Sequence, residues 1–284
     1  MAPLILADRA VITVRGADAP AFLQSLVSAD IEALTDGAAS PAALLTPQGK
    51  VLFDMIVSRD DDGFFIDCRA EMADDLAKRL SFYRLRSKVE IGRDESIKVV
   101  WSPPAQTPPP QTPDDTLSPD PGSPELGSRG LSRGPFGEDG TPAYHDLRVV
   151  AGIAEAGIDY DPDTVFAHEA NLDVLSGVSF TKGCFIGQEV VSRMHHRGTA
   201  RKRFLPCSIQ GDVPEKGTSV SAGQRMIGTT GSSASGRLLA LLRLDHLDTA
   251  IGNATPIIAA GARLTPRIPG WLDAAIPDLM QQSA

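Results

Sequence analysis

One thiol stands out in this chain, because Cys184 follows a lysine and lies between two glycines in the octapeptide KGCFIGQE at 182–189. The thiolate is the reactive form of cysteine, and a neighbouring cation or a helix N-terminus favours it. Lys182 is such a cation, and the segment from Gln188 and Glu189 onward reads as the first turn of a helix. These residue types predict a nucleophile, a redox group or a weak metal ligand. The alternative is a tight turn whose cysteine is merely small and buried.

An acid within an apolar run is the second candidate for chemistry. Asp54 interrupts the sequence VLFDMIV at 51–57, which reads as a strand. A buried carboxylate needs partners, and such groups are common at functional sites. Asp54 therefore joins Cys184 and Lys182 as a predicted catalytic residue. A helix cap or a surface charge is the alternative.

Two basic clusters are candidates for binding an anion. They suit a carboxylate or phosphate group, or RNA, and the alternative is a solvated face. RNA is the weaker prediction, because aromatic residues make up only 5% of the chain and none interleaves the second cluster. No metal site is predicted, because adjacent histidines point to different sides of a helix. The first cluster is Arg84, Arg86 and Lys88; the second is Arg193, Arg197, Arg201, Lys202 and Arg203, with His195 and His196 between them.

The composition limits the class of protein. A length of 284 residues suggests about two domains, and a net charge of -9 argues against general binding of nucleic acid. The three cysteines lack zinc-ligand spacing and favour a reducing compartment. No apolar run reaches the ~18 residues of a membrane span, and the N-terminus lacks the layout of a signal peptide. We therefore expect a cytoplasmic protein, most simply a monomer, with no membrane partner.

Alternating and helical apolar patterns predict the elements that position these residues. The loop TPQG at 46–49 reads as a hairpin connection, and Asp18 is placed to cap the first helix. Several strands and helices in irregular order indicate an α+β fold. Strands are predicted at 10–15, 42–45, 51–57, 63–68, 89–91 and 97–101, with helices at 21–27 and 72–82.

The composition changes twice further along the chain. Residues 103–143 hold half of the 22 prolines and few apolar residues, which predicts a flexible insertion or linker. From residue 204 onward, short apolar runs separated by glycines predict a small antiparallel barrel or sandwich. Those runs are 204–209, 219–221, 226–230, 238–244 and 256–258.

Several motifs together resemble the signature of YgfZ-type folate-binding proteins, whose mitochondrial relatives serve iron–sulfur cluster assembly. These motifs are NLD at 171–173, GVSFT at 177–181, KGCFIGQE at 182–189, LLTPQGK at 44–50 and YRLR at 83–86. The resemblance covers the chain outside the proline-rich segment. It implies an accessory factor for the assembly or repair of iron–sulfur enzymes that uses Cys184 and binds tetrahydrofolate or a derivative. Its partners would be assembly proteins or client enzymes.

The same architecture is similar to the T-protein of the glycine cleavage system, an aminomethyltransferase. The segment LRVVAG at 147–152, followed by Gly157 and Asp159, looks like a pattern of that enzyme. The likeness implies a folate-binding α+β region over 1–102 and 144–203, with a C-terminal β-barrel over 204–284. The transferase has two adjacent aspartates where this chain has only Asp54, and it lacks the cysteine of the KGC motif. Both differences favour the YgfZ-like alternative over aminomethyl or one-carbon transfer.

The resemblance also supplies candidate folate ligands. A pterin ring calls for a carboxylate or an amide, and the glutamate tail of folate calls for arginine or lysine. Asp54, Glu169 and Asn171 are the candidates for the ring. The full set predicted to bind the cofactor is Glu169, Asn171, Gln188, Glu189, Arg193, Arg84 and Arg148.

A third predicted function is that of a module associated with tRNA modification, because the same fold is also associated with a tRNA-modification protein.

Overall fold

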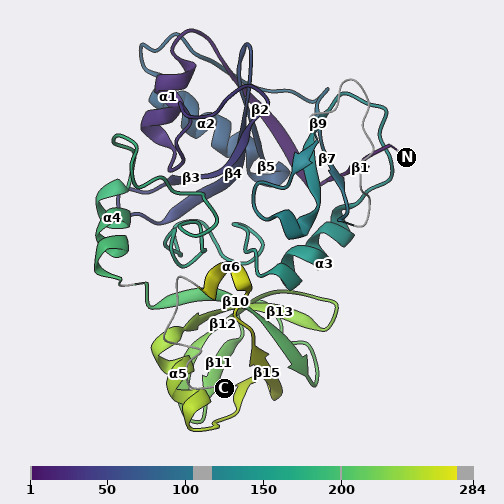
Figure 1. The fold of residues 1–284 in the computed structure, drawn as a ribbon, viewed down its shortest axis with the longest axis vertical. Coiled ribbons are helices and arrows are strands. Elements are labelled where there is room, and N and C mark those ends of the chain that lie inside the picture. Colours follow the sequence, from purple (N-terminus) through teal and green to yellow (C-terminus); the bar gives the residue numbers. More distant parts are fainter. Residues whose placement is uncertain (1, 105–116, 199, 274–284) are drawn as a thin grey trace.

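A computed structural model describes residues 2–104, 117–198 and 200–273. Three sheets organise the chain: a five-stranded sheet in the order β3-β4-β5-β2-β6, a four-stranded sheet in the order β1-β7-β9-β8, and a closed barrel. Figure 1 shows the barrel at one end of the molecule and the two open sheets at the other. The architecture is the α+β region with a C-terminal antiparallel barrel that the sequence predicted.

The bounds of the elements are as follows. The strands are β1 (Leu4–Ile5), β2 (Arg9–Arg15), β3 (Ala39–Leu45), β4 (Val51–Asp60), β5 (Gly63–Arg69), β6 (Glu90–Arg93), β7 (Lys98–Ser102), β8 (Ser118–Pro119), β9 (Ser128–Ser132), β10 (Lys202–Gln210), β11 (Ser219–Ala222), β12 (Arg225–Ala234), β13 (Arg237–Arg243), β14 (Ile257–Ala259) and β15 (Ala262–Pro266). The helices are α1 (Ala19–Leu26), α2 (Ala73–Arg84), α3 (Thr141–Ala151), α4 (Gln188–Arg197), α5 (Leu244–Gly252) and α6 (Gly270–Asp273), with short 3-10 turns η1 (Ala70–Met72) and η2 (Pro124–Leu126). No helix of the described ranges is long and apolar enough to cross a membrane.

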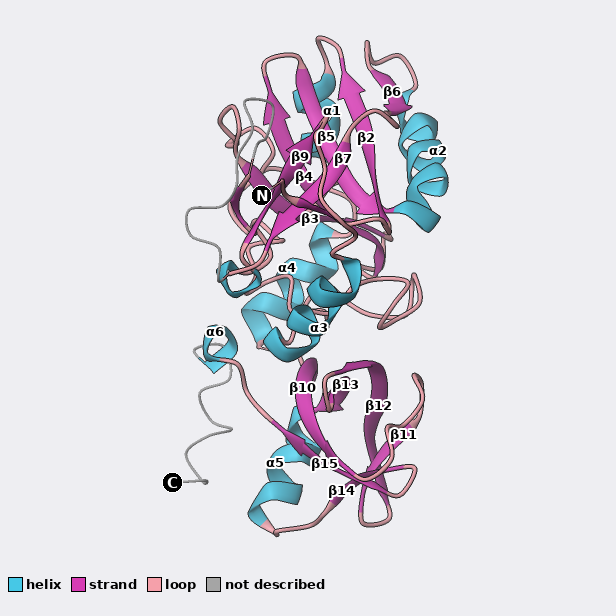
Figure 2. Ribbon diagram, turned by 90° about the vertical axis from the view of Figure 1, so that its right-hand side faces the viewer, coloured by secondary structure: helices cyan, strands magenta, loops and turns pink. Residues whose placement is uncertain are grey.

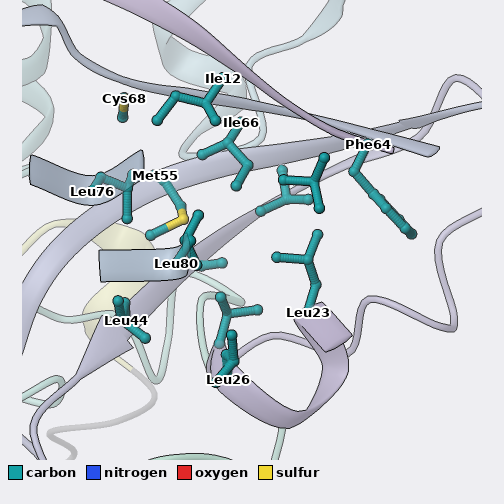
Figure 3. Close-up of a cluster of buried hydrophobic side chains, with 14 of the residues drawn as sticks. Ile12, Leu23, Leu26, Leu44, Met55, Phe64, Ile66, Cys68, Leu76 and Leu80 are labelled. Carbon is teal, nitrogen blue, oxygen red and sulfur yellow. The ribbon is translucent and has the colours of Figure 1, made fainter. Parts of the chain in front are cut away.

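The five-stranded sheet and helices α1 and α2 enclose the first core. Apolar residues alternate along β4, so that Phe53, Met55 and Val57 are buried on one side. Figure 3 shows Leu23 and Leu26 of α1 facing side chains of this sheet. Cys68 lies in the same core, as its strand pattern predicted. This packing fixes β4 and therefore the position of Asp54.

The predicted flexible insertion over 103–143 is wrong for residues 117–143, and residues 105–116 lie outside the described part. Strand β9 pairs with β7, and β8 pairs with β9. Leu126 is fully buried, and its carbonyl oxygen accepts a hydrogen bond of 2.6 Å from Nε1 of Trp101. A few well-placed apolar side chains against Trp101 are enough to order the segment, although its average composition resembles a linker.

The six strands from β10 to β15 close into a barrel around a separate core. Strand β10 pairs with β13 on one side and with β15 on the other. Cys207 is buried there, as predicted. Strand β15 and helix α5 were not predicted. Figure 2 shows α3 and α4 between the open sheets and the barrel, so both helices stand where the two regions meet.

The N-cap position predicted for Asp18 is confirmed, but its side chain does not cap the helix. Asp18 occupies the position before α1 but makes no capping hydrogen bond. Its carboxylate instead accepts a hydrogen bond of 2.7 Å from the backbone N–H of Lys88. Pairing with a distant segment therefore replaces the local cap, and it fixes the chain that follows α2.

Candidate functional site

The KGC octapeptide forms the loop that leads into α4, and it packs on the β3–β4 hairpin turn. Gly187 has φ +83°, and a Cβ there would lie 2.6 Å from the carbonyl oxygen of Thr46. The same Cβ would lie 3.1 Å from Cα of Gly49, which has φ +80°. Two motifs that are far apart in sequence are therefore in backbone contact, and glycine at both positions permits the approach.

Lys182 anchors this loop to the segment that follows α1. Its Nζ donates hydrogen bonds to the carbonyl oxygens of Val27 at 2.7 Å and Ala29 at 2.6 Å. The side chain is buried, and burial lowers the pKa of Lys182 to about 8. Ser28, which lies between these two residues, holds the segment before the loop, because its Oγ donates to the carbonyl oxygen of Gly177. The ammonium group thus donates to two carbonyls, and its predicted influence on the thiol stays a prediction.

Cys184 is exposed on this braced loop, whereas Cys68 and Cys207 are buried. Burial raises the pKa of the Cys68 thiol to about 12 and that of Cys207 further still. The alternative of a small buried cysteine at 184 is therefore wrong. Among the three thiols, only Cys184 is accessible to a partner.

The predicted helix beginning at Gln188 is confirmed as α4. Glu189 and Arg193 form an exposed ion pair one turn apart on this helix. Nε2 of Gln188 donates to the carbonyl oxygen of Gly183 at 3.5 Å. These three predicted folate ligands therefore lie on α4, directly after the loop that carries Cys184.

A second site lies in the interior, around Asp54. The carboxylate of Asp54 accepts hydrogen bonds from the backbone N–H of Ala156 at 2.7 Å and from the hydroxyl of Tyr160 at 3.0 Å. Burial raises the pKa of Asp54, and the charge of nearby Glu155 raises it further. A cavity of 60 Å³ adjoins these groups. Its polar lining comprises Arg9, Asp54, Asp120, Arg129, Tyr144 and Glu155.

A network of buried charges surrounds the cavity. Asp67 lies between two guanidinium groups, 2.7 Å from Nε of Arg9 and 2.7 Å from Nη2 of Arg129. Nη1 of Arg129 donates to the hydroxyl of Tyr144 at 2.6 Å, and that hydroxyl donates to Asp120 at 3.1 Å. Opposite charges offset the cost of burying each member.

Glu155 is a member of this network with a buried oxygen that lacks a hydrogen bond. Its Oε2 is buried without a hydrogen-bond partner and lies 3.6 Å from Nη1 of Arg9. Burial by itself raises the pKa of Glu155, but the guanidiniums of Arg148 and Arg9 hold it below its ordinary value. The cavity therefore contains an ionised carboxylate with a free acceptor.

Comparison with known proteins identifies the family of this chain. Residues 201–274 match the model of the CAF17 C-terminal beta-barrel domain. The mitochondrial iron–sulfur cluster assembly factor IBA57 of Mus musculus is 31% identical over 280 residues, which cover 85% of this chain and 77% of the mouse protein. The chain belongs to the IBA57 family. The resemblance drawn from the motifs is confirmed at this level, for IBA57 rather than for YgfZ itself.

Two further relatives agree with this assignment. The human IBA57 is 31% identical and covers 76% of this chain, which spans 69% of the human protein. The Neurospora crassa homologue is 34% identical and covers 74% of the chain, which spans 54% of that longer protein. Both are named mitochondrial iron–sulfur cluster assembly factors.

A solved structure confirms the fold class. The glycine cleavage system aminomethyltransferase T from Bartonella henselae superposes with a TM-score of 0.72 at 17% identity. The match covers 94% of this chain and 85% of the transferase. This IBA57-family chain therefore has the transferase fold.

Three other predicted folate ligands of this IBA57-family chain lie where the α+β region meets the barrel. Arg148 is buried and donates to Asp159 at 2.6 Å and to Ser232 of β12 at 3.1 Å. Nδ2 of Asn171 donates to the carbonyl oxygen of Phe204 at 2.9 Å. Glu169 accepts from the backbone N–H of Phe166 at 3.0 Å. Through these hydrogen bonds, Arg148 and Asn171 connect the α+β region to the barrel.

The members of the second predicted basic cluster do not share one exposed face. Arg203 is buried against Asp173 at 2.8 Å, so it leaves the second cluster, while Arg201 and Lys202 remain exposed. Arg84 lies exposed at the end of α2 and donates to the carbonyl oxygen of Val89 at 3.5 Å. Charge runs in sequence therefore did not reveal which side chains share a face.

Sequence reasoning missed most of the Asp54 cavity. Glu155 follows the LRVVAG motif by three residues, and this position was the available signal. Arg129 and Asp120 fall within the segment predicted to be flexible, and Arg9 opens the first long strand. Only the packing of the two open sheets brings these residues together.

Proposed function

We propose that this chain is an iron–sulfur cluster assembly factor in which the thiolate of Cys184 contributes one ligand to a cluster shared with a partner protein. The observation that carries the proposal is the single exposed thiol on a loop that Lys182 and two close-packed glycines brace. The IBA57 relatives bear the name of cluster assembly factors, which supplies the substrate class.

The ligand count explains why a partner is needed. An iron–sulfur cluster is normally held by four cysteine ligands. Within residues 2–104, 117–198 and 200–273, no group of three His, Cys, Asp or Glu side chains could hold a metal ion. One exposed thiolate suits a cluster in transit, which is cargo here, with the other ligands coming from the donor or the recipient. Its exposure lets either protein approach.

We also propose that tetrahydrofolate or a derivative binds at the Asp54 cavity. The residues fit the group, because Oε2 of Glu155, which has no hydrogen-bond partner, and the Asp54 carboxylate are acceptors for pterin N–H groups. The space at Asp54 is smaller than the ~300–1,000 Å³ of typical ligand pockets. A neighbouring cavity of 30 Å³ shares Ile56 and Arg129 with it, and an outer pocket of 380 Å³ shares Ser58 with that cavity. The folate would carry a one-carbon unit, while Asp54 and Glu155 would orient its ring.

The second candidate function is folate-dependent aminomethyl or one-carbon transfer. Its support is Asp54, a carboxyl group that accepts hydrogen bonds from Ala156 and Tyr160 and whose pKa burial raises, as is common for groups that transfer protons in catalysis. The accessory role is favoured because it also uses the exposed thiol. Formation of methylene-tetrahydrofolate by the pure protein, lost in Asp54→Asn, would instead support the transferase.

We propose a reducing compartment as the place of action, with the cytoplasm as the expected one. All three cysteines are free, and reducing compartments keep thiols in that state. The relatives compared above carry mitochondrial names. Fractionation of the host cell with an antibody to this chain distinguishes the cytoplasm from an organelle.

The test is activity of a [4Fe–4S] enzyme such as aconitase in cells that lack this protein. The native chain should restore that activity, and Cys184→Ser at equal abundance should not. Cys68→Ser is the control, since that thiol is buried and away from solvent. Restoration by Cys184→Ser would contradict a role for the thiol. An unchanged aconitase activity in the deletion strain would contradict the assembly role itself.

A further inference from the structure

The C-terminal end of α2 exposes two large apolar side chains. Phe82 is 76% exposed and Leu85 is 88% exposed, the highest values among the large apolar residues of the described chain. Leu85 has φ +45°, a conformation that residues with a side chain rarely adopt. Exposed apolar groups that lie together commonly mark a site of interaction.

A groove runs beside Phe82 along the same face of α2. It has a volume of 590 Å³, and its apolar wall includes Leu52, Phe53 and Pro162. The spacing of Asp75, Lys78, Arg79 and Phe82 places them on one side of the helix. Its full lining is Leu52, Phe53, Met72, Asp75, Lys78, Arg79, Phe82, Gly157 and Pro162. The groove is large enough to take apolar side chains of a peptide segment.

Five basic residues without an ion pair among the described residues lie on α2 and just after it, two of them in the groove beside Asp75. Lys78 and Arg79 line the groove, and three further basic residues follow Phe82. None of the five forms an ion pair with another described residue, whereas the acidic Asp74 of α2 pairs with Arg93. In a chain with a net charge of -9, such a group is unusual. The five residues are Lys78, Arg79, Arg84, Arg86 and Lys88.

We propose that this α2 patch, made of Phe82, Leu85, the groove and the five basic residues, docks an acidic amphipathic segment of a partner protein. Carboxylates of the segment would meet the unpaired ammonium and guanidinium groups, and an apolar side chain would enter the groove beside Phe82. A concave groove suits a peptide better than a bilayer surface.

The α2 patch lies on elements other than the Cys184 loop, so the inference goes beyond the proposed function. The patch consists of α2 with residues 85–88, the start of β4 and the 157–162 segment. Docking there would leave the thiol free for a cluster. Its test requires neither a cluster nor folate, so failure of one proposal does not decide the other.

Selection from a random peptide library displayed on phage tests the proposal on the full chain. The library is first depleted on a Phe82→Ser/Leu85→Ser variant and then selected on the native protein. Enriched peptides should carry several Asp or Glu residues around an aromatic or aliphatic side chain. A synthetic peptide of the enriched sequence should bind at least about tenfold more weakly to the variant, as expected when buried anchors are removed.

Matched controls separate docking from folding. Met226→Ser removes another exposed apolar side chain, 57% exposed on the barrel, and should leave peptide affinity unchanged. Lys78→Glu/Arg79→Glu keeps both apolar anchors and should weaken binding in low salt. This charge variant tests the proposal even if the serine variant fails to fold.

Three results would overturn the proposal. One is enrichment of peptides without acidic residues, or no enrichment at all. Another is equal binding of the selected peptide to the native chain and to both α2 variants. The third is sedimentation of the native chain with vesicles of phosphatidylcholine and phosphatidylserine, lost in Phe82→Ser/Leu85→Ser, which would assign the patch to a lipid surface.

Discussion

The Cys184 loop and the Asp54 cavity place reactive groups in opposite surroundings. Cys184 is exposed, and the groups that brace it lie beneath the loop. Asp54 is half-buried and accepts hydrogen bonds from fixed donors, and one oxygen of Glu155 is buried without a hydrogen bond. A thiolate that meets a cluster on another protein has to be reachable. A carboxylate that orients a bound ring gains strength from exclusion of water.

The two regions also differ in what holds them. The cavity depends on pairs of buried charges, each costly to break. The loop depends on backbone fit, with Gly187 against Thr46, and on one lysine that donates to two carbonyls. Substitutions should therefore damage stability at the cavity and leave it nearly intact at the thiol itself.

The largest loss of stability is expected for Arg129→Met. Arg129 contacts Asp67 and Tyr144 in the interior, and its removal leaves buried charge uncompensated. We expect the free energy of unfolding to fall by about 3–5 kcal/mol in urea titrations. The control is Arg133→Met just beyond β9, since Arg133 is exposed and pairs only with surface groups. Its effect should be below about 1 kcal/mol. Equal stability of the two variants would contradict a cavity held by buried charge.

A smaller loss is expected for Gly187→Ala. The added Cβ would lie 2.6 Å from the carbonyl oxygen of Thr46 at φ +83°. The strain should lower the free energy of unfolding by about 1–3 kcal/mol. Gly183→Ala in the same loop is the matched control, because nothing lies within 4 Å of its Cβ position. If both alanines have the same effect, the contact between the two motifs is not what holds the loop.

Lys182 should make stability depend on pH in the alkaline range. Its folded pKa of about 8 lies below its ordinary value of 10.5, so the unfolded chain binds more protons between these pH values. Stability contributed at this position therefore rises with pH from about 8 to 10.5 and is constant below that range. The difference in unfolding free energy between native protein and Lys182→Met should shift in favour of the native chain across this window. A difference that is independent of pH would contradict the burial of the ammonium group.

The smallest effect on stability is expected for Cys184→Ser. The thiol is exposed, and the loop is held by other groups. The free energy of unfolding should change by less than about 0.5 kcal/mol, although the variant should not restore aconitase. Alkylation with iodoacetamide supplies a second measurement: mass spectrometry of the native chain should find rapid modification at Cys184 and not at Cys68 or Cys207. Rapid labelling of a buried thiol would weaken the contrast between the two sites.

Local patterns were sufficient for much of the fold. Alternation predicted the β3–β4 hairpin and its turn, the acid after Gly187 predicted the start of α4, and glycine-separated runs predicted the barrel. These features depend on near neighbours in the chain, which a sequence displays directly. The KGC motif also indicated the accessible thiol among three cysteines.

Only the tertiary structure decided where the charges point. Lys182 is adjacent to Cys184 in sequence, yet its ammonium turns to the carbonyls of Val27 and Ala29. Arg129 lies in a segment of linker-like composition, yet it pairs with Asp67 in the interior. A long charged side chain pairs with the carbonyl or carboxylate groups that the fold places near its end. Its partners are therefore set by packing between distant segments and not by its neighbours in sequence.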